Sequence, residues 1–407
     1  MLTRAFPLGA LLFGAIALLS MPANPVLAQR PDLAEAVATA LRANPDILLA
    51  RLRVDSSRAE RTIAGAIPAF TASSIPQVPW QYALSAPLDI GPQRWLRTHA
   101  AARGVVATEA DAADVRRDVV FAVRTAFVDV LLAESLRALA VEERDLLQQV
   151  LAADSARQRA GDVPARDVVR AEVEFSRADA AATRAATQLH QARLALQLLM
   201  GRADPDTAFT IRGDLEFRPV TLPDSLLTLA YAARPDVRAA DARIEASRSL
   251  GTLAAAALVP TPVATLVHQD GAPFQNGSTY ALGLGLQLPL LYWNQGERER
   301  SRAGLEAAQV VARQARARVA TDVAAALDGY RQARALAERY HDGLVTRAAE
   351  GLAASRYAYD AGAASFLDLI DAIRTHAAVR ADDVTARHDY WVAVFALEHA
   401  SSVEFQP

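Results

Sequence analysis

Two very long helical patterns limit what this chain can fold into more than any other feature of its sequence. Between residues 93 and 159, apolar side chains recur at steps of three or four, as at Val115, Val119 and Val123, and no proline interrupts them. This spacing predicts one helix, and residues 296–360 predict another. A helix of about 65 residues is roughly 100 Å long. The chain must therefore be elongated rather than globular.

Two other parts of the chain have a period of two. Apolar and small or polar residues alternate along residues 80–90 and, most clearly, along residues 279–291, where Tyr280, Leu282 and Leu284 are separated by Ala281 and Gly283. Alternation of this kind predicts strands with one apolar face. We expect strands within residues 68–90 and 262–291.

The second half of the sequence repeats the first. Asn44-Pro45-Asp46 corresponds to Arg234-Pro235-Asp236, and Gly161 corresponds to Gly362, at a separation of roughly 200 residues. We expect a first unit at residues 29–200, with a helix, strands and a helical hairpin that turns near residues 160–165. A connecting segment, 201–222, leads to a second unit at 223–407, whose hairpin turns near residues 360–365.

The N-terminus has the pattern of a secretory signal peptide. Arg4 precedes an apolar run at residues 5–19, and Val26-Leu27-Ala28 provides small residues for cleavage. The alternative is an uncleaved membrane anchor, but the run is short for a spanning helix of about 20 residues. We expect residues 1–28 to be removed during export and no spanning helix to remain.

Several kinds of site are excluded or unsupported. The chain has no cysteine, which rules out disulfides, thiolate metal sites and a cysteine nucleophile. A net charge of -3 gives no general attraction to nucleic acid. The seven histidines show no ligand spacing typical of zinc, and no phosphate-binding glycine motif is present. We therefore expect neither an enzyme nor a cofactor.

Four strands with one apolar face cannot form a closed barrel, because membrane barrels begin at about eight strands. In an exported protein such strands suit an outer membrane, where a closed barrel satisfies every backbone group. The chain is therefore expected to oligomerise.

The order of motifs resembles the outer membrane factors of tripartite efflux systems, the TolC-like family, over about residues 33–400. The motifs that carry the resemblance are the two helix openings Ala40–Pro45 and Ala233–Val237, and the two helix-tip patterns Gly161, Asp167, Val168, Ala171 and Tyr359, Gly362, Asp368, Leu369, Asp371, Ala372. Two further motifs, residues 87–97 and Leu288-Pro289-Leu290 with Asn294-Gln295-Gly296, are similar to the heavy-metal, CzcC-like branch. Pro92 stands where a second glycine is usual in that branch.

The resemblance implies a mainly α fold with a small β part. It implies a homotrimer in which each chain gives four strands to a twelve-stranded outer-membrane barrel, continued by a long α-helical barrel in the periplasm. Such a trimer is a passive exit duct that works with a periplasmic adaptor and an inner-membrane pump of the RND type, here for heavy-metal cations. The alternatives are a duct for drugs or for type I protein secretion, and a soluble periplasmic coiled-coil scaffold, which would leave the alternating leucines in water.

Two carboxylates near the second turn are candidates for a constriction. Asp368 and Asp371 are three residues apart and share a helix face. The resemblance places them at the periplasmic mouth, where six carboxylates in a trimer would select cations. The alternative is that Ser365 and Asp368 form a capping box at the start of a helix.

Other candidate residues lie at the two hairpin turns. The resemblance implies that Tyr359, Arg166 and Asp167 form polar links that hold the tip closed, next to the turns at Gly161, Pro164 and Gly362. Ala364 stands where the best-known family member has a linking arginine. The alternative for all three linking residues is ordinary solvated helix surface.

Overall fold

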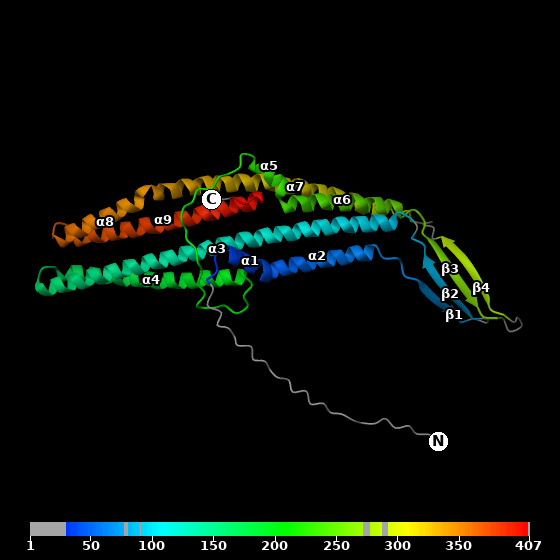
Figure 1. Ribbon diagram of the computed structural model, residues 1–407, viewed down its shortest axis with the longest axis horizontal. Coiled ribbons are helices and arrows are strands. Elements are labelled where there is room, and N and C mark those ends of the chain that lie inside the picture. Colours follow the sequence, from blue (N-terminus) through cyan, green and yellow to red (C-terminus); the bar gives the residue numbers. More distant parts are fainter. Residues whose placement is uncertain (1–29, 77–79, 90, 272–276, 287–291, 406–407) are drawn as a thin grey trace, which may run out of the picture.

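The computed structural model describes residues 30–76, 80–89, 91–271, 277–286 and 292–405. The predicted signal peptide, Ile90 and Leu288-Pro289-Leu290 lie outside the described residues. The chain is strongly elongated, with a β-sheet at one end and the turns of two helical hairpins at the other (Figure 1).

The order of elements in the first half occurs again in the second half. The first half consists of α1 (Leu33–Ala43), α2 (Pro45–Ala64), β1 (Thr71–Ile75), β2 (Gln81–Pro87), α3 (Gln93–Ala160) and α4 (Ala165–Leu199). The second half consists of α5 (Leu226–Ala233), α6 (Pro235–Ala256), β3 (Pro262–Gln269), β4 (Thr279–Leu286), α7 (Gln295–Arg339), the π-helical turn η1 (Tyr340–Leu344), α8 (Val345–Asp360) and α9 (Phe366–Ser401).

The long helices form a wall that is four helices wide. Helix α3 runs along the whole helical part, with α2 and α4 placed end to end on one side of it and α6 and α9 end to end on the other (Figure 1). Helices α7 and α8 form the fourth column, packed against α6 and α9. The short helices α1 and α5 lie at the middle of the wall, where the stacked helices meet (Figure 1).

Each pair of stacked helices is joined by a side chain just before a proline. The Asn44 side chain accepts hydrogen bonds from the first turn of α2 and donates to the Leu199 carbonyl at the end of α4, at 2.9 Å. In the second half, Arg234 Nη1 donates to the Ala400 carbonyl at the end of α9, at 3.2 Å. The proline at position 45 breaks the helical path between α1 and α2, and the residue before it joins two helices.

Residues 202–225 cross the wall without forming a helix or strand (Figure 1). Two hydroxyl groups fix this strap to the helices beneath it. The Tyr390 hydroxyl donates to the Arg218 carbonyl at 2.9 Å and accepts from the Val220 amide at 3.1 Å, and the Tyr330 hydroxyl donates to the Val220 carbonyl at 3.3 Å. The apolar side chains of the strap enter the main core; they are Phe209, Ile211, Leu215 and Val220.

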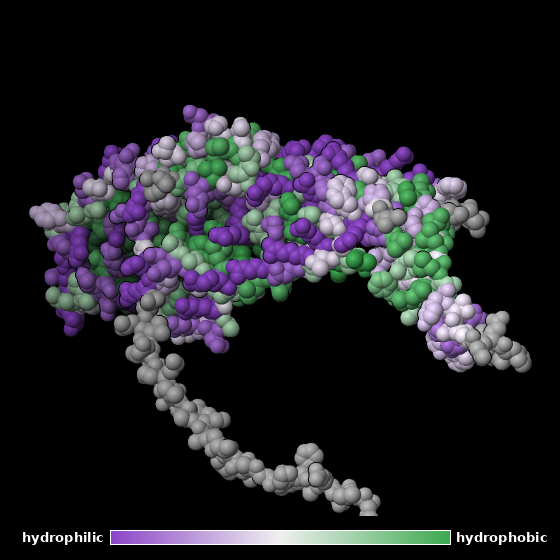
Figure 2. Space-filling model, turned by 45° about the vertical axis from the view of Figure 1, so that its right-hand side comes forward, coloured by the Kyte–Doolittle hydropathy of each residue, from purple (hydrophilic) through white to green (hydrophobic). Residues whose placement is uncertain are grey.

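The sheet is antiparallel with the order β1-β2-β3-β4. Leu84, Leu266 and Leu282 lie opposite one another in register, and Leu282 is 82% exposed. On the other face of the sheet, Ser85 and Thr265 lie opposite each other, and a small residue of β4 lies in register with them. The hydroxyl oxygens of Ser85 and Thr265 are 3.2 Å apart. The predicted alternation is thus confirmed, and apolar residues gather where the sheet adjoins the helical part of the molecule (Figure 2).

The sequence predicted one continuous helix over residues 296–360, and this prediction was wrong. The structure ends α7 at Arg339 and inserts η1, where Asp342 and Gly343 leave the helical conformation and Gly343 has a φ of +99°. A positive φ suits glycine, because it has no Cβ atom to clash with the backbone. Within the described ranges, no helix is both long and apolar enough to cross a membrane.

Candidate functional site

The candidate residues lie at the end of the molecule opposite the sheet, which we call the tip. It comprises the turn of the first hairpin, between α3 and α4, and the turn of the second hairpin, between α8 and α9 (Figure 1). In the first turn Gly161 ends α3 with a φ of +88°, and Pro164 precedes α4 in an extended conformation. In the second turn Gly362 has a φ of +75°. Both turns depend on a glycine in the left-handed backbone conformation, which few other residues adopt.

Ser365 and Asp368 form the start of α9. The Ser365 hydroxyl donates to Asp368 Oδ2 at 2.7 Å, the Ser365 amide donates to the same oxygen at 2.9 Å, and the Asp368 amide donates back to Ser365 Oγ at 3.3 Å. This is a complete capping box. The two hydrogen bonds from Ser365 hold the pKa of Asp368 below its usual value, so this carboxyl group is charged at neutral pH.

Asp371 lies one turn further along α9 and is exposed, as Asp368 is. The opposite side of the same turns is buried between the hairpins, in a cluster made by Leu147 and Val150 of α3, Ala171 and Ala178 of α4, and Phe366, Leu369, Ile370 and Ile373 of α9. The apolar face fixes the rotation of α9. Both carboxylates consequently point away from the chain's own core, into space that solvent or another chain would occupy.

Tyr359 joins the two hairpins. Its hydroxyl donates to Asp154 Oδ1 of α3 at 2.7 Å, and its ring contacts Phe366 edge to face with the centroids 6.4 Å apart. Arg157 lies over the same ring at 5.5 Å and donates to the Asp360 carbonyl at 3.2 Å. Burial and the hydrogen bond to Asp154 raise the pKa of Tyr359. The hydroxyl therefore remains a donor over the whole physiological range.

Asp154 is a fully buried carboxyl group near the tip. It is 0% exposed, and its second oxygen, Oδ2, is buried without a hydrogen-bond partner among the described residues. A buried carboxylate is costly unless it is hydrogen-bonded. The Tyr359 hydroxyl is thus the one hydrogen-bond donor to this carboxylate in the described part of the chain.

Arg166 and Asp167 do not take part in this link. Arg166 Nε lies 3.6 Å from Asp167 Oδ1, and Arg170 Nη1 lies 3.7 Å from the same oxygen. These are local contacts within the first turns of α4. The structure brings Tyr359 to Asp154 and Arg157 instead, which sequence reasoning did not identify. Asp154 follows Leu147 and Val150 on one helix face, so a single carboxylate on an apolar stripe was the available signal.

Further from the turns, charged pairs connect α9 to the first hairpin. Arg374 donates to Glu174 of α4 at 2.6 Å, and Arg380 donates to Glu142 of α3 at 2.7 Å. Where the structure describes the chain, no group of three or more His, Cys, Asp or Glu residues could hold a metal ion.

Comparison with solved structures identifies the class of protein to which this fold belongs. The chain is similar to the MtrE outer membrane channel of Neisseria gonorrhoeae, with 22% identity, a TM-score of 0.78, and coverage of 91% of this chain and 88% of MtrE. It is also similar to a membrane protein from Pseudomonas aeruginosa, with 22% identity, a TM-score of 0.79, and coverage of 91% and 90%. The fold is that of TolC-like outer-membrane channels.

The family follows from the sequence. The family described as outer membrane efflux protein matches residues 36–202 and 226–401, and the chain belongs to this family. The chain is also 26% identical to the cobalt-zinc-cadmium resistance protein CzcC of Cupriavidus metallidurans over 292 residues. This aligned region covers 72% of this chain and 69% of CzcC. The predicted resemblance to the efflux family and its CzcC-like branch is confirmed, and the family is one of channels rather than enzymes.

Proposed function

We propose that this protein is the outer-membrane exit duct of a tripartite efflux system and that it exports divalent heavy-metal cations. It works as a homotrimer, coupled through a periplasmic adaptor to an inner-membrane pump of the RND type. The observation that carries the metal substrate is the similarity to the cobalt-zinc-cadmium resistance protein CzcC. A passive duct needs no catalytic residue or cofactor, because the pump supplies the energy.

The sheet supports assembly from several copies. Strands β1 and β4 are its two edges, and neither has a second strand partner among the described residues. Unpaired backbone groups are very unfavourable inside a membrane, so the edges must meet other chains. Three copies joined edge to edge make a barrel of twelve strands. Its lipid face is the apolar one that carries Leu84, Leu266 and Leu282, and its lumen face carries Ser85 and Thr265.

The helical wall supports the same assembly. Among the described residues, each outer column, α2 with α4 and α7 with α8, packs against one neighbouring column of long helices. Large apolar side chains are exposed along both columns, including Leu49 and Leu52 on α2 and Val310 and Val311 on α7. Neighbouring copies would cover them and close the walls into a periplasmic helical barrel. In this arrangement a cleaved signal peptide at residues 1–28 directs export.

The tip is the gate of this duct. Tyr359 holds the second hairpin to Asp154 of the first hairpin. Asp368 and Asp371 from three copies would place six carboxylates around the opening and favour cations over anions. Gly161, Pro164 and Gly362 supply the tight turns that let the hairpins end close together. Arg166 and Asp167 lie on the first hairpin beside this opening.

A deletion strain tests the substrate. Loss of the gene should lower the growth-inhibiting concentrations of cobalt, zinc and cadmium by several fold, and the wild-type gene should restore them. Increased sensitivity to organic drugs alone, or loss of a secreted protein alone, would contradict the metal substrate and leave the export duct in place.

Two adjacent residues of β3 test the barrel. Leu266→Arg places a charge on the apolar face and should prevent assembly in the outer membrane, because such a charge costs about 2–4 kcal/mol at the bilayer midplane. Thr265→Arg, on the opposite face of the same strand, is the matched control and should assemble and restore metal resistance. Equal assembly of the two variants, or a stable soluble monomer of the wild-type protein, would contradict the trimeric barrel.

A further inference from the structure

Large apolar side chains are exposed where the sheet joins the helices. The chain passes between a long helix and a strand four times, from α2 to β1, from β2 to α3, from α6 to β3 and from β4 to α7. Each passage carries at least one such side chain, and these side chains are between 48% and 67% exposed. We call this set the junction patch; it consists of Ile67, Phe70, Trp95, Val259, Tyr292 and Trp293.

Aromatic members of the junction patch are held in place by neighbouring residues but keep their rings exposed. The Tyr292 hydroxyl donates to Glu297 Oε2 at 2.6 Å and accepts from the Gly296 amide at 3.0 Å, while the residue stays 48% exposed. Trp95 stacks on His99 with the ring centroids 5.1 Å apart and is 65% exposed. Tyrosine and tryptophan, which combine a polar edge with an apolar ring, are enriched at membrane–water interfaces.

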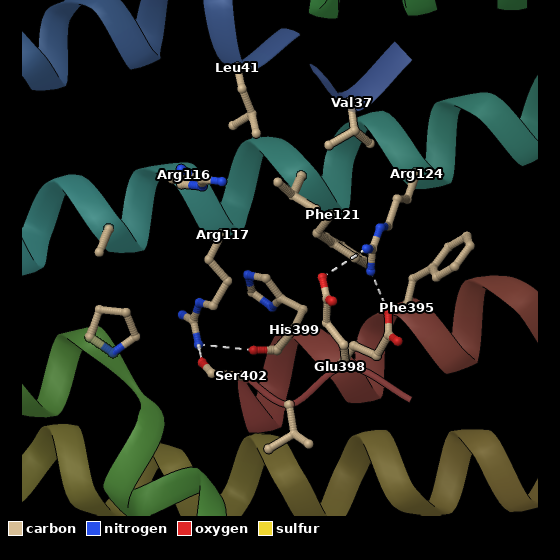
Figure 3. Close-up of a pocket in the computed structure, with 15 residues that line it drawn as sticks. Val37, Leu41, Arg116, Arg117, Phe121, Arg124, Phe395, Glu398, His399 and Ser402 are labelled. Atoms are coloured by element: carbon tan, nitrogen blue, oxygen red, sulfur yellow. Dashed lines mark hydrogen bonds and ion pairs between the residues drawn. The ribbon is translucent and has the colours of Figure 1, made fainter. Parts of the chain in front are cut away.

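The middle of the helical wall is built differently. There Val37 and Leu41 of α1 and Phe121 of α3 are only partly exposed and pack against the main core. Beside them Arg124 of α3 donates to Glu398 of α9 at 2.5 Å (Figure 3). The chain thus covers these apolar side chains itself, which it does not do at the junction.

The length of the central strands indicates what lies against the junction patch. At the end of the sheet away from the helices, Tyr82, His268 and Tyr280 lie in register, with neighbouring ring centroids 6.1 and 4.6 Å apart. Such an aromatic row belongs at the headgroup level of a membrane. From His268 back to Val263, β3 extends about 17 Å and rises about 13 Å at a tilt of about 40°. This is roughly half of an apolar band about 25 Å tall, so the band must continue past the sheet onto the junction.

We propose that the junction patch is inserted in the periplasmic leaflet of the outer membrane, among phospholipid headgroups and the adjoining parts of the acyl chains. This inference rests on the proposed barrel, and apolar residues gather at this junction (Figure 2). A neighbouring copy would cover only the outer columns, but Trp95 and Val259 lie at the ends of α3 and α6, which have helices of the same chain on both sides. Facing water in the lumen, such large apolar side chains would be unfavourable. The first turn of α3 is therefore embedded in the membrane surface.

Fluorescence quenching in lipid vesicles tests this inference, because the four tryptophans of the chain lie at different distances from the junction. Three variants each keep one tryptophan, Trp95, Trp293 or Trp391, and have the other three replaced by Phe. The full-length protein is reconstituted in phosphatidylcholine that carries bromine near the carbonyl end of its acyl chains. Trp95 and Trp293 should each lose at least half of their fluorescence relative to vesicles without bromine. Trp391, which lies in the helical wall and donates to the Glu216 carbonyl at 3.0 Å, should keep its fluorescence.

Trp80 separates failure of this inference from failure of the barrel. It stacks on Tyr82 at the far end of the sheet, with the ring centroids 6.4 Å apart, so a variant that keeps only Trp80 reports on the barrel itself. Quenching of Trp80 without quenching of Trp95 and Trp293 would overturn the inference and leave the barrel in place, as would equal quenching of Trp391. No quenching of any of the four would overturn both. If loss of Trp391 prevents folding, a variant that keeps Trp391 together with Trp95 gives the same decision, since only Trp95 should be quenched.

Discussion

Replacing Tyr359 with Phe removes a single hydroxyl group and should destabilise the closed tip. The ring of residue 359 keeps its contacts with Phe366 and Arg157. The Asp154 carboxylate, in contrast, loses its hydrogen-bond donor at 2.7 Å while it remains 0% exposed. When the hairpins separate, water can solvate Asp154 in both proteins. The loss therefore falls on the closed state.

The magnitude follows from the charge of the acceptor. A hydrogen bond to a charged group contributes about 1.5–3 kcal/mol, and loss of the donor leaves a buried charge unsatisfied. This corresponds to roughly a 10- to 150-fold change in the ratio of separated to joined hairpins in each chain. Replacing both partners with apolar groups should recover part of the loss, because no buried carboxylate remains. The double variant Tyr359→Phe with Asp154→Leu should thus open less often than Tyr359→Phe alone.

Single-channel recording in planar bilayers measures this change as the fraction of time in the high-conductance state. Tyr357→Phe is the matched control, since Tyr357 lies two residues away on α8 and is 79% exposed. Tyr359→Phe should raise the open fraction at least tenfold and Tyr357→Phe should leave it unchanged. If both variants behave as the wild type does, or if both open equally, the link between Tyr359 and Asp154 does not hold the tip closed.

Three further predictions concern charged groups. Replacing Asp368 and Asp371 together with Ala should abolish cation preference in bilayer recordings with only a small fall in melting temperature; a double variant that keeps its selectivity would leave capping as the role of this helix start. The Arg234 side chain is 4% exposed, so Arg234→Met breaks a buried ion pair and should lower the free energy of unfolding in denaturant by about 3–5 kcal/mol. Arg316→Met breaks an exposed ion pair and should lower it by less than about 1 kcal/mol. Equal losses in the two variants would contradict the importance of burial. Burial opposes the charge of His388, but its hydrogen bonds to two aspartates outweigh burial and raise the pKa of His388. The contribution of His388 to stability is therefore fully present below about pH 6.5 and should be lost as pH rises through the raised pKa. Melting curves of His388→Gln that keep this pH dependence would refute the assignment.

Much of the fold could be predicted because its signals are local and periodic. The long helix that ends at Gly161 and the strand with alternating leucines at residues 279–286 follow from spacing along short stretches. The π-helical turn at Tyr340–Leu344 could not be predicted in the same way. A single glycine within a helical pattern is often tolerated, and Gly343 differs from the other helical glycines in its backbone conformation, which spacing does not report.

The candidate site could be only partly predicted from the sequence, for a different reason. Gly161, Gly362 and the capping box of Ser365 are defined by neighbouring residues, so their local geometry can be read from the sequence. The partner of Tyr359 is 205 positions away. No periodicity within α3 or α8 identifies Asp154 as that partner, because the pairing depends on how the two hairpins are aligned in the folded chain.

The π-helical turn makes the two hairpins mechanically unequal. Helix α3 is continuous over 68 residues, so it resists bending along its whole length and acts as a stiff strut. Its counterpart in the second hairpin is interrupted at η1, and only the 16 residues of α8 separate that pivot from the turn. A force applied at the tip will therefore deflect the second hairpin as a short lever while the first remains in place. In the proposed trimer, the second hairpin of each chain would therefore move when the tip opens, while the first hairpin would keep its position.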